Sequence, residues 1–357
     1  MSRVADRRMY YTIDGLRGLA ALLVVTRHIV PLHAGTLSSA SSYLAVELFF
    51  LFSGFVIAHA YDRRFEEGLG FWTFAKARIL RLYPLYFLAF AVAVLTIPVA
   101  RLFGIATWPL DPAVILPGLF MLPTFAVGAH GLVYPFNNPS WTLFFELVAN
   151  FAYALVWPRL TNKALAAVLV ASGCALAYTA IHFGSLDVGF SAKHFVGGFG
   201  RVFFSFFAGV AVYRFQTFKP CPVNIGPWIF LACAILLVAA PHRGLDRTVY
   251  DIVCALVVFP VFAYLATATE PGPKGQKVFA LGGGASYALY LIHSPLGGVL
   301  NQFFVLFGRP KGSALLGITF IAGAAVIAWL AEKYYDRPVR RWINGLTAPK
   351  PAPTAAR

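Results

Sequence analysis

The chain has 357 residues, of which 59% are hydrophobic, 16% aromatic and only 12% charged. This composition leaves too little polar surface to cover a soluble protein of this size, so it excludes an ordinary soluble domain and indicates an integral membrane protein. A formal net charge of +15 would point to nucleic acid in a soluble chain. A polytopic protein, however, collects Lys and Arg in its cytoplasmic loops, and we expect no nucleic-acid partner.

Neither the cysteines nor the first apolar run indicates metal binding or processing. The four cysteines are Cys174, Cys221, Cys233 and Cys254. They share no short metal-like spacing, and three of them lie in strongly apolar runs. We interpret them as packing residues and expect no metal site. The first apolar run is long enough to span a membrane and lacks a small-residue cleavage site behind it, so we expect it to remain as the first helix.

A membrane-spanning helix needs roughly 20 predominantly apolar residues. On that test we predict an all-α integral membrane fold, a bundle of about ten transmembrane helices at 14–32, 43–60, 80–103, 141–157, 164–183, 196–214, 225–241, 249–268, 285–307 and 313–333. The stretch 113–126 is apolar but short, and it contains Pro117 and Pro123. We therefore predict a re-entrant or surface-lying segment there.

The distribution of positive charge orients this predicted bundle. If the N-terminus is inside, the inner segments carry 20 Lys and Arg residues and the outer segments carry 5. The positive-inside rule then places both termini in the cytoplasm. No repeat or soluble domain is visible, so we predict one transmembrane domain over residues 1–345. The Pro- and Ala-rich residues 346–357 are predicted to form a disordered cytoplasmic tail.

Ionisable residues inside the predicted spans are few, and each costs about 2.5–3.5 kcal/mol at the bilayer centre. Four of them, each from a different helix, lie four or five residues from the predicted outer ends: His28, Glu47, Glu146 and Arg201. Each of these polar side chains would cost free energy if it faced lipid alone, so we expect them to share one polar cavity. The alternative is a structural ion-pair network, for example between Arg201 and Glu47.

Arginines gather near the predicted cytoplasmic end. Arg17 and His28 are 11 residues apart, which brings them to within about 20° of one helical face and separates them by about 16 Å along the axis. Arg78 and Arg81, at i and i+3 where the third predicted helix begins, share one helical face. Guanidinium forks at this spacing suit phosphate groups. The alternative role is anchoring at lipid headgroups.

Two further segments bring polar side chains to the bundle. The run before Glu146 offers candidate helix caps and an interfacial aromatic ring: Asn138, Ser140 and Trp141. The ninth predicted helix places three polar side chains on one stripe: Ser286, Tyr290 and His293. Such a stripe is typical both of a site and of hydrogen bonds between helices, and the spacing leaves both interpretations open.

Together these segments resemble the acyltransferase-3 family, multi-pass membrane enzymes that O-acylate bacterial polysaccharides, lipopolysaccharide and lipo-oligosaccharide signals. The resemblance covers about residues 10–343. Its motifs are an Arg followed after ten residues by His, a Val-acid pair leading into Phe-Phe and Ser-Gly-Phe, Arg-x-x-Arg, and Ser-Trp-(Ser/Thr)-Leu-x-x-Glu. In this chain they stand at Arg17 and His28, Val46 to Phe55, Arg78 and Arg81, and Ser140 to Glu146.

This chain differs from the family pattern at two positions, and the given sequence also lacks a domain that some members carry. Glu47 stands where the family more often has Asp, and Asp336-Arg337-Pro338 stands where it usually has Glu-x-Pro. Some members also carry an extracytoplasmic esterase-like domain after the bundle, and the given sequence stops before one.

The resemblance implies a mechanism for these residues. Acyl-CoA, usually acetyl-CoA, would serve as donor co-substrate, with no permanently bound cofactor, and Arg17, Arg78 and Arg81 would bind it from the cytoplasm. His28 would be the general base on an acceptor hydroxyl, with Glu146 orienting its imidazole and Arg17 assisting. Transient acylation of His28 is a second route. Supporting or acceptor-side roles fall to Glu47, Ser140, Trp141, Arg201, Tyr290 and His293, with Arg201 or groups near Trp141 stabilising the oxyanion.

The partners expected from the resemblance are acyl-CoA, a cell-envelope glycan or glycolipid as acceptor, and the lipid of the bacterial cytoplasmic (inner) membrane. The sequence gives no oligomeric state and does not identify the acceptor. The alternative function is a proton-coupled transporter that uses the buried His28 and Glu146. The lack of recognisable inverted repeats and broken-helix pairs argues against it. A non-catalytic scaffold is a third interpretation, against which the retained motifs argue.

Overall fold

The computed structural model describes residues 9–37, 39–105, 109–216, 225–239, 244–308 and 310–347. Within these ranges the regular elements are helices, apart from one isolated β-bridge between Leu132 and Ser191. The α-helices are α1 (Tyr11–His28), α2 (Val30–His33), α3 (Ala45–Glu66), α4 (Phe71–Leu102), α5 (Pro112–Leu119), α6 (Trp141–Val156), α7 (Asn162–Phe183), α8 (Gly197–Phe215), α9 (Gly226–Val238), α10 (Leu245–Val253), α11 (Phe259–Thr267), α12 (Pro273–Phe307), α13 (Ala314–Ala331) and α14 (Arg337–Thr347).

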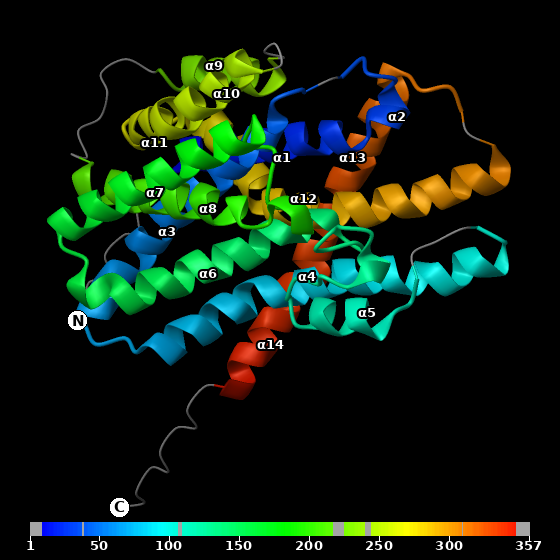
Figure 1. Ribbon diagram of the computed structural model, residues 1–357, viewed down its shortest axis with the longest axis horizontal. Helices are drawn as coiled ribbons and strands as arrows, with labels where there is room; N and C mark the ends of the chain where they lie inside the picture. Colours follow the sequence, from blue (N-terminus) through cyan, green and yellow to red (C-terminus); the bar gives the residue numbers. More distant parts are fainter. Residues whose placement is uncertain are drawn as a thin grey trace, which may run out of the picture.

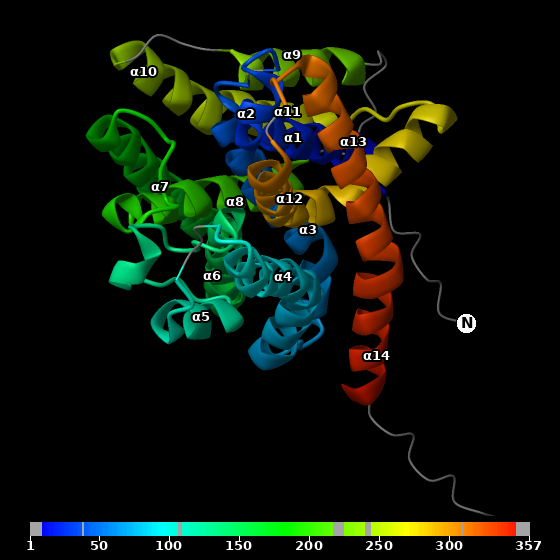
Figure 2. The same cartoon turned by 90° about the vertical axis from the view of Figure 1, so that its right-hand side faces the viewer.

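The long helices form a bundle. α4, α6, α7, α8 and α12 run in roughly the same direction across the molecule (Figure 1). α13 crosses them steeply and continues into α14, and the two make one long rod along a side of the bundle (Figure 2). Within the bundle, α1 packs along α12, and α3 packs along α8. These two pairs carry most of the polar residues singled out above.

Close approach between α3 and α8 depends on two glycines. A Cβ atom at Gly54 would overlap the backbone of Phe206, and one at Gly209 would overlap the backbone of Leu51. Small residues are what allow helix backbones to meet closely in a lipid environment, where no hydrophobic force drives helices together. The contact fixes α3 and α8 side by side, and it sets the geometry of the buried ion pair described below.

Seven helices in the described ranges are long and apolar enough to cross a membrane: 42–66, 71–102, 138–159, 162–183, 245–267, 273–307 and 314–345. The predicted count of about ten spans is not confirmed, although a helix is present at each of the ten predicted segments. The other three differ for physical reasons. α1 and α8 carry charged side chains within their length, and α9 has only 13 residues.

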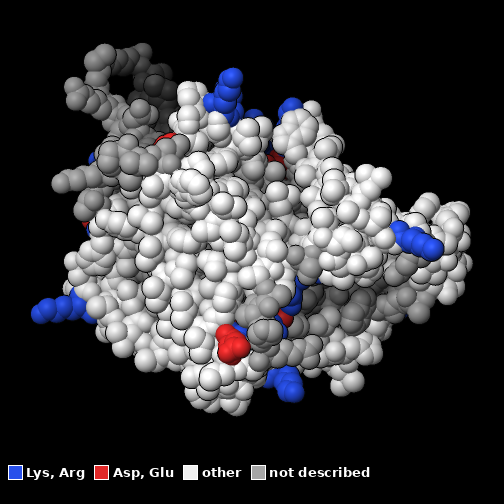
Figure 3. Space-filling model, turned by 90° about the horizontal axis from the view of Figure 1, so that it is seen from above, with Lys and Arg blue, Asp and Glu red and all other residues white. Residues whose placement is uncertain are grey.

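The surface agrees with a lipid environment. The face seen in Figure 3 is predominantly uncharged, and the few charged side chains on it lie mostly near its margin. Many large apolar side chains elsewhere on the helices are also exposed, among them Leu95, Ile181 and Val326. Exposed apolar surface on this scale is typical of helices that face lipid rather than water.

The segment predicted to be re-entrant forms the short helix α5, followed by irregular chain. Asp111 caps α5 by accepting a hydrogen bond from the backbone N–H of Ala113 at 2.8 Å. Tyr83 Oη donates to the carbonyl oxygen of Leu119 at 2.8 Å, which ties the end of α5 to α4. The eight residues of α5 are too few to cross a bilayer. A re-entrant path is not confirmed.

The C-terminal rod contains a π-helical turn over Glu332–Asp336. A π-turn inserts one extra residue into a helix and rotates the next helical segment about the axis, and such turns often mark functional sites. Here the buried Asp336 lies beside Arg81 of α4. The predicted domain 1–345 and tail 346–357 are not tested by this arrangement, since residues 1–8 and 348–357 lie outside the described residues.

Candidate active site

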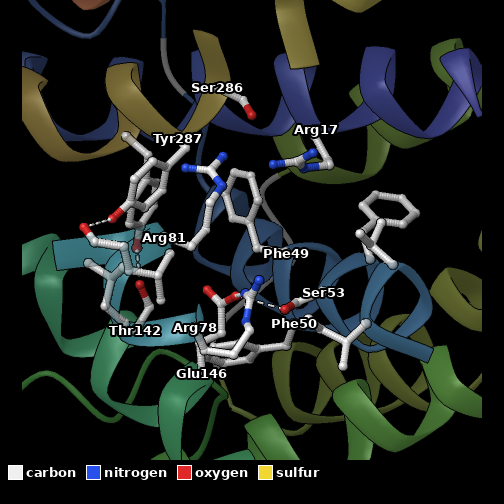
Figure 4. A pocket seen from close by; sticks show the side chains of 16 residues that line it. Arg17, Phe49, Phe50, Ser53, Arg78, Arg81, Thr142, Glu146, Ser286 and Tyr287 are labelled. Carbon is white, nitrogen blue, oxygen red and sulfur yellow. Dashed lines mark hydrogen bonds and ion pairs between the residues drawn. The ribbon is translucent and has the colours of Figure 1, made fainter. Parts of the chain in front are cut away.

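A cavity of about 170 Å³ lies between α1, α3, α4, α6 and α12. We call it the arginine cavity, because three of the residues lining it are Arg17, Arg78 and Arg81. Arg17 extends from α1, and the other two extend from successive turns of α4 (Figure 4). The structure thus brings together the three arginines that the sequence assigned to the donor phosphates.

Each of these arginines has one carboxylate nearby, but no pair is bidentate. The nitrogen–oxygen distances are 3.3 Å for Arg17–Asp14, 3.2 Å for Arg78–Glu146 and 3.8 Å for Arg81–Asp336. The buried Nε of Arg78 and Nη1 of Arg81 have no hydrogen-bond acceptor among the described residues. A guanidinium carries five N–H donors, so this cavity retains donor capacity for an anionic ligand such as a phosphate.

Glu146 belongs to the arginine cavity. Its Oε1 accepts hydrogen bonds from Ser53 Oγ at 2.7 Å and from Arg78 Nη2 at 3.2 Å. The predicted contact between Glu146 and His28 is wrong, because the two line different cavities. The prediction assumed that His28 and Glu146 lie equally far from the outer ends of their helices. It failed because α1 ends at His28, four residues before the predicted end. His28 therefore lies at its helix terminus, while Glu146 lies within α6.

His28 is held in one tautomer by its own helix. Its Nδ1 lies 2.9 Å from the carbonyl oxygen of Val24. A carbonyl can only accept, so Nδ1 carries the proton, and in the neutral ring Nε2 has a free lone pair. His28 is exposed although it lies among packed helices, because two cavities meet at its ring. The Val24 carbonyl thus orients the imidazole, the task that the sequence assigned to Glu146.

The first cavity at His28 measures about 110 Å³, and we call it the polar cavity. Its charged, amide and aromatic lining includes Arg27, Asn138, Trp141, Asp187, Arg201 and Tyr290. Asp187, in the loop after α7, forms an ion pair with Arg27 at 2.5 Å. Tyr290 lines both the polar cavity and the arginine cavity. The two spaces therefore adjoin through the Tyr290 side chain.

Arg201 and Glu47 form a buried ion pair behind the polar cavity. The Nη2 of Arg201 donates to Glu47 Oε2 at 2.8 Å and to the carbonyl oxygen of Tyr43 at 2.9 Å. Its Nη1 donates to the carbonyl oxygen of Val188 at 2.7 Å. This is the structural ion pair that the sequence left open as an alternative. Because all three nitrogens of the guanidinium are engaged, Arg201 holds the scaffold and has little capacity left for an oxyanion.

A second cavity at His28 measures about 260 Å³. We call it the glycine cavity, since Gly297 and Gly298 of α12 form part of its wall. His293 lines it as well, with its ring centroid 5.0 Å from that of His28. The Nδ1 of His293 lies 3.0 Å from the carbonyl oxygen of Leu289, and its buried Nε2 has no partner among the described residues.

The remaining predicted residues fall in three places. Trp141 lines the polar cavity, and its ring lies 5.2 Å from the guanidinium carbon of Arg201. The hydroxyl of Tyr290 accepts a hydrogen bond from Thr142 Oγ1 at 3.1 Å. Ser140 lies in neither cavity at His28. Its buried Oγ has no described partner, and the predicted side-chain cap on α6 is wrong, because neither Asn138 nor Ser140 donates or accepts such a bond.

Three residues that contribute to the site were not predicted as such. Ser53 lies in the Ser-Gly-Phe motif and contacts Glu146. Asp187 lies in a loop without periodic pattern, so only its position as an isolated outer carboxylate could have drawn notice. Asn137 Nδ2 donates to the carbonyl of Leu291 at 3.1 Å. That carbonyl loses its helical donor to Pro295, so a proline inside a predicted helix is the signal that could have found Asn137.

Comparison with known proteins assigns the family. A family described as an acyltransferase domain matches residues 10–333. The chain is 39% identical over 189 residues to "Protein 2 in picA locus" of Rhizobium radiobacter, covering 49% of this chain and 96% of that protein. It is 27% identical over 357 residues to "Acyltransferase MdmB" of Streptomyces mycarofaciens, covering 90% of this chain and 86% of that protein. No solved structure matches. The chain is a multi-pass membrane protein, and it belongs to the acyltransferase-3 family.

Proposed function

We propose that this protein transfers an acyl group, acetyl in the simplest case, from acyl-CoA to a hydroxyl group of an envelope glycan or glycolipid. The observation that carries the proposal is the state of His28. Its Nδ1–H is held by the Val24 carbonyl, so that Nε2 is left as the base at the junction of two cavities. A positioned neutral imidazole of this kind is the usual general base for a hydroxyl nucleophile.

The donor side of the proposal rests on the arginine cavity. Arg17, Arg78 and Arg81 line it. The Nε of Arg78 and the Nη1 of Arg81 have no hydrogen-bond acceptor among the described residues, which supports an anionic ligand there. The phosphates of coenzyme A would bind there, and the pantetheine arm would run past Tyr290, which lines the next cavity as well. In this arrangement the thioester reaches His28, and Arg17 contributes to donor binding rather than to the chemical step.

In the proposed reaction His28 carries out both proton transfers. His28 Nε2 takes the proton of the acceptor hydroxyl while the oxygen attacks the thioester carbonyl carbon. The new carbon–oxygen bond forms, the carbon–sulfur bond breaks, and the coenzyme A thiolate leaves. The imidazolium returns its proton to the thiolate, which restores the neutral ring. Acylation of Nε2 before transfer to the hydroxyl would use the same atom.

The acceptor side of the proposal rests on the polar cavity. A carboxylate, an amide and an aromatic ring line it, at Asp187, Asn138 and Trp141. Hydroxyl-rich sugars are bound by such combinations of polar groups and ring faces. The positive-inside rule supports an orientation in which the termini and the arginine cavity face the cytoplasm. We propose that donor and acceptor approach from opposite sides of the bacterial cytoplasmic membrane.

A transfer assay in liposomes tests the function. Purified protein receives acetyl-CoA labelled in the acetyl group together with an envelope glycan fraction. We expect labelled, alkali-labile product from the native protein and none from His28→Ala. The matched control His182→Ala, which changes an exposed histidine of α7, should transfer normally. Normal transfer by His28→Ala would contradict the mechanism, and uptake of label into the liposome lumen without product would indicate a transporter instead.

A further inference from the structure

The proposed mechanism leaves the largest of the three cavities without a ligand. The glycine cavity measures about 260 Å³ and, like the polar cavity, is lined by His28. It lies between the end of α1 with α2 and the second half of α12. A space of this size beside the reacting base can hold part of a substrate.

We propose that the glycine cavity holds the acyl chain of the donor, so that this protein accepts linear acyl groups longer than acetyl. The proposal rests on the proposed function. Besides the carbonyl oxygen, three groups meet at a thioester carbonyl carbon under attack: the sulfur, the attacking oxygen and the acyl chain. In the proposed mechanism the sulfur and the rest of coenzyme A come from the arginine cavity past Tyr290, which lines both that cavity and the polar cavity. The acceptor comes from the polar cavity. The third direction from His28 is the glycine cavity.

The lining of the glycine cavity favours an uncharged chain. None of its ten residues is Asp, Glu, Lys or Arg. Six of them are apolar or glycine, namely Ile29, Pro31, Leu32, Gly297, Gly298 and Phe304, and the other four are the polar residues His28, His293, Ser294 and Asn301. The polar cavity, in contrast, is lined by the charged Arg27, Asp187 and Arg201. A hydrocarbon chain gains free energy on leaving water for an apolar wall, whereas it would desolvate charged groups in the polar cavity at a cost.

His293 supports the same assignment at the reacting end. Its Nδ1 is bound to the Leu289 carbonyl, so the buried Nε2 is an acceptor without a partner. A hydrocarbon chain cannot satisfy an acceptor, but a neighbouring hydroxyl of a sugar acceptor can donate to it, while the attacking hydroxyl gives its one proton to His28. The rings of His28 and His293 are 5.0 Å apart. The two lone pairs therefore mark the place where the acyl chain ends and the acceptor hydroxyl begins.

Gly298 lines the cavity at a position that leaves room for a side chain to begin. A Cβ atom there would meet nothing within 4 Å, and one at Gly297 would meet only Phe320 at 3.9 Å. We expect Gly298→Phe to place its ring in the space proposed for the chain. Gly323→Phe is the matched control, because a Cβ at Gly323 also meets nothing within 4 Å and the residue does not line the cavity.

The test measures the affinity of purified protein in lipid nanodiscs for coenzyme A and for acetyl-, butyryl- and hexanoyl-CoA by calorimetry. In the native protein we expect affinity to rise with chain length by roughly fourfold for each buried methylene. In Gly298→Phe this rise should vanish while coenzyme A and acetyl-CoA bind as before. In Gly323→Phe it should persist. Phe304→Ala, which lengthens the cavity, should extend the rise to longer chains.

Two results would overturn the proposal. The first is equal affinity of the native protein for all four ligands. The second is an unchanged chain-length series in Gly298→Phe together with weaker transfer to the glycan fraction, which would assign the cavity to the acceptor. Binding is measured without transfer, so failure of the liposome assay and failure of the chain-length series are distinguished from each other.

Discussion

Arg201 and Glu47 form an ion pair in which each side chain is 1% exposed. It joins α8 to α3, two helices whose backbones also meet closely at Gly54 and Gly209. It also fixes the loop after α7, since Arg201 donates to the Val188 carbonyl. That loop carries Asp187 of the polar cavity. The pair therefore connects helix packing to the shape of the candidate acceptor site.

Removing either partner of this pair should destabilise the protein strongly. A buried charge left without its partner costs about 3–5 kcal/mol. Arg201→Met should be worse than Glu47→Leu, because it also removes the donors that Arg201 provides to the Val188 and Tyr43 carbonyls. We expect both variants to lower the midpoint of thermal unfolding measured in detergent. Arg63→Met, which breaks the exposed Arg63–Glu67 pair, should change stability by less than about 0.5 kcal/mol, and a similar small change in Arg201→Met would contradict the account.

The arginine cavity should discriminate donors by their phosphates. Loss of one charge-assisted hydrogen bond costs about 1.5–3 kcal/mol, so Arg78→Ala or Arg81→Ala should raise the KM for acetyl-CoA roughly tenfold or more. Acetyl-pantetheine lacks the adenosine phosphates, and its KM should stay unchanged. Arg63→Ala, at an exposed position of α3, serves as the control. Equal losses with both donors would show that the arginines support folding or the chemical step instead.

Glu146 should act on the donor and have little effect on the base. Glu146→Gln keeps an oxygen that can accept from Ser53 and Arg78 but removes the negative charge beside the arginine. We expect a change in KM for acetyl-CoA with kcat altered less than about tenfold, since the Val24 carbonyl, and not Glu146, fixes the His28 tautomer. Loss of kcat by about four orders of magnitude, as a triad carboxylate would give, would instead restore Glu146 to the catalytic group.

The sequence predicted the contacts that depend on local spacing. Arg78 and Arg81 at i and i+3 do share a cavity, and Ser286, Tyr290 and His293 do follow one face of α12 from the arginine cavity to the glycine cavity. It could not predict the partner of Glu146. That contact depends on where each helix ends and how far each is rotated about its axis, and a count along the sequence fixes neither.

The contacts of loop residues could not be predicted from the sequence either. Asp187 has no periodic neighbours, and its contact with Arg27 joins positions 160 residues apart. The pairing of Arg201 with Glu47 was named as the alternative to a shared cavity, because charges inside spans are few and each needs a partner. Scarcity of buried charge is therefore a usable signal within the helices. In the loops, where polar residues are ordinary, the same reasoning does not discriminate.

Asp336 should position Arg81. The π-turn brings its buried carboxylate to 2.7 Å from Arg340 and 3.8 Å from Arg81. We expect Asp336→Asn to raise the KM for acetyl-CoA but not for acetyl-pantetheine, because Arg81 loses the charge that anchors it. Asp336→Glu keeps the charge and should retain most donor binding. Asp246→Asn, at an exposed position of α10, is the control, and a rise in KM for both donors would assign Asp336 to folding alone.

The loop that carries Asp187 should loosen in acid because of His194, which lies outside the membrane-spanning segments. Its Nδ1 accepts a hydrogen bond from the backbone N–H of Gly189 at 3.0 Å, so the ring must be neutral, and Nε2–H can donate to Ser191 Oγ at 2.9 Å. Burial is the main cause that lowers the pKa of His194 below its ordinary value. Protonation would remove the acceptor and break the bond to Gly189.

The sign of the pH effect depends on that direction. With the folded pKa below the unfolded one, the unfolded chain binds more protons in between, so the contribution of His194 to stability is complete above about pH 6.5. It is lost as the pH falls through the lower, folded value. We expect amide exchange in residues 185–194, corrected for its intrinsic pH dependence, to be faster at about pH 5.5 than at about pH 7.5. His194→Gln, which cannot titrate, should show no such difference. A native loop equally protected at both pH values would mean that other contacts, such as Arg201 with the Val188 carbonyl, hold it without help from His194.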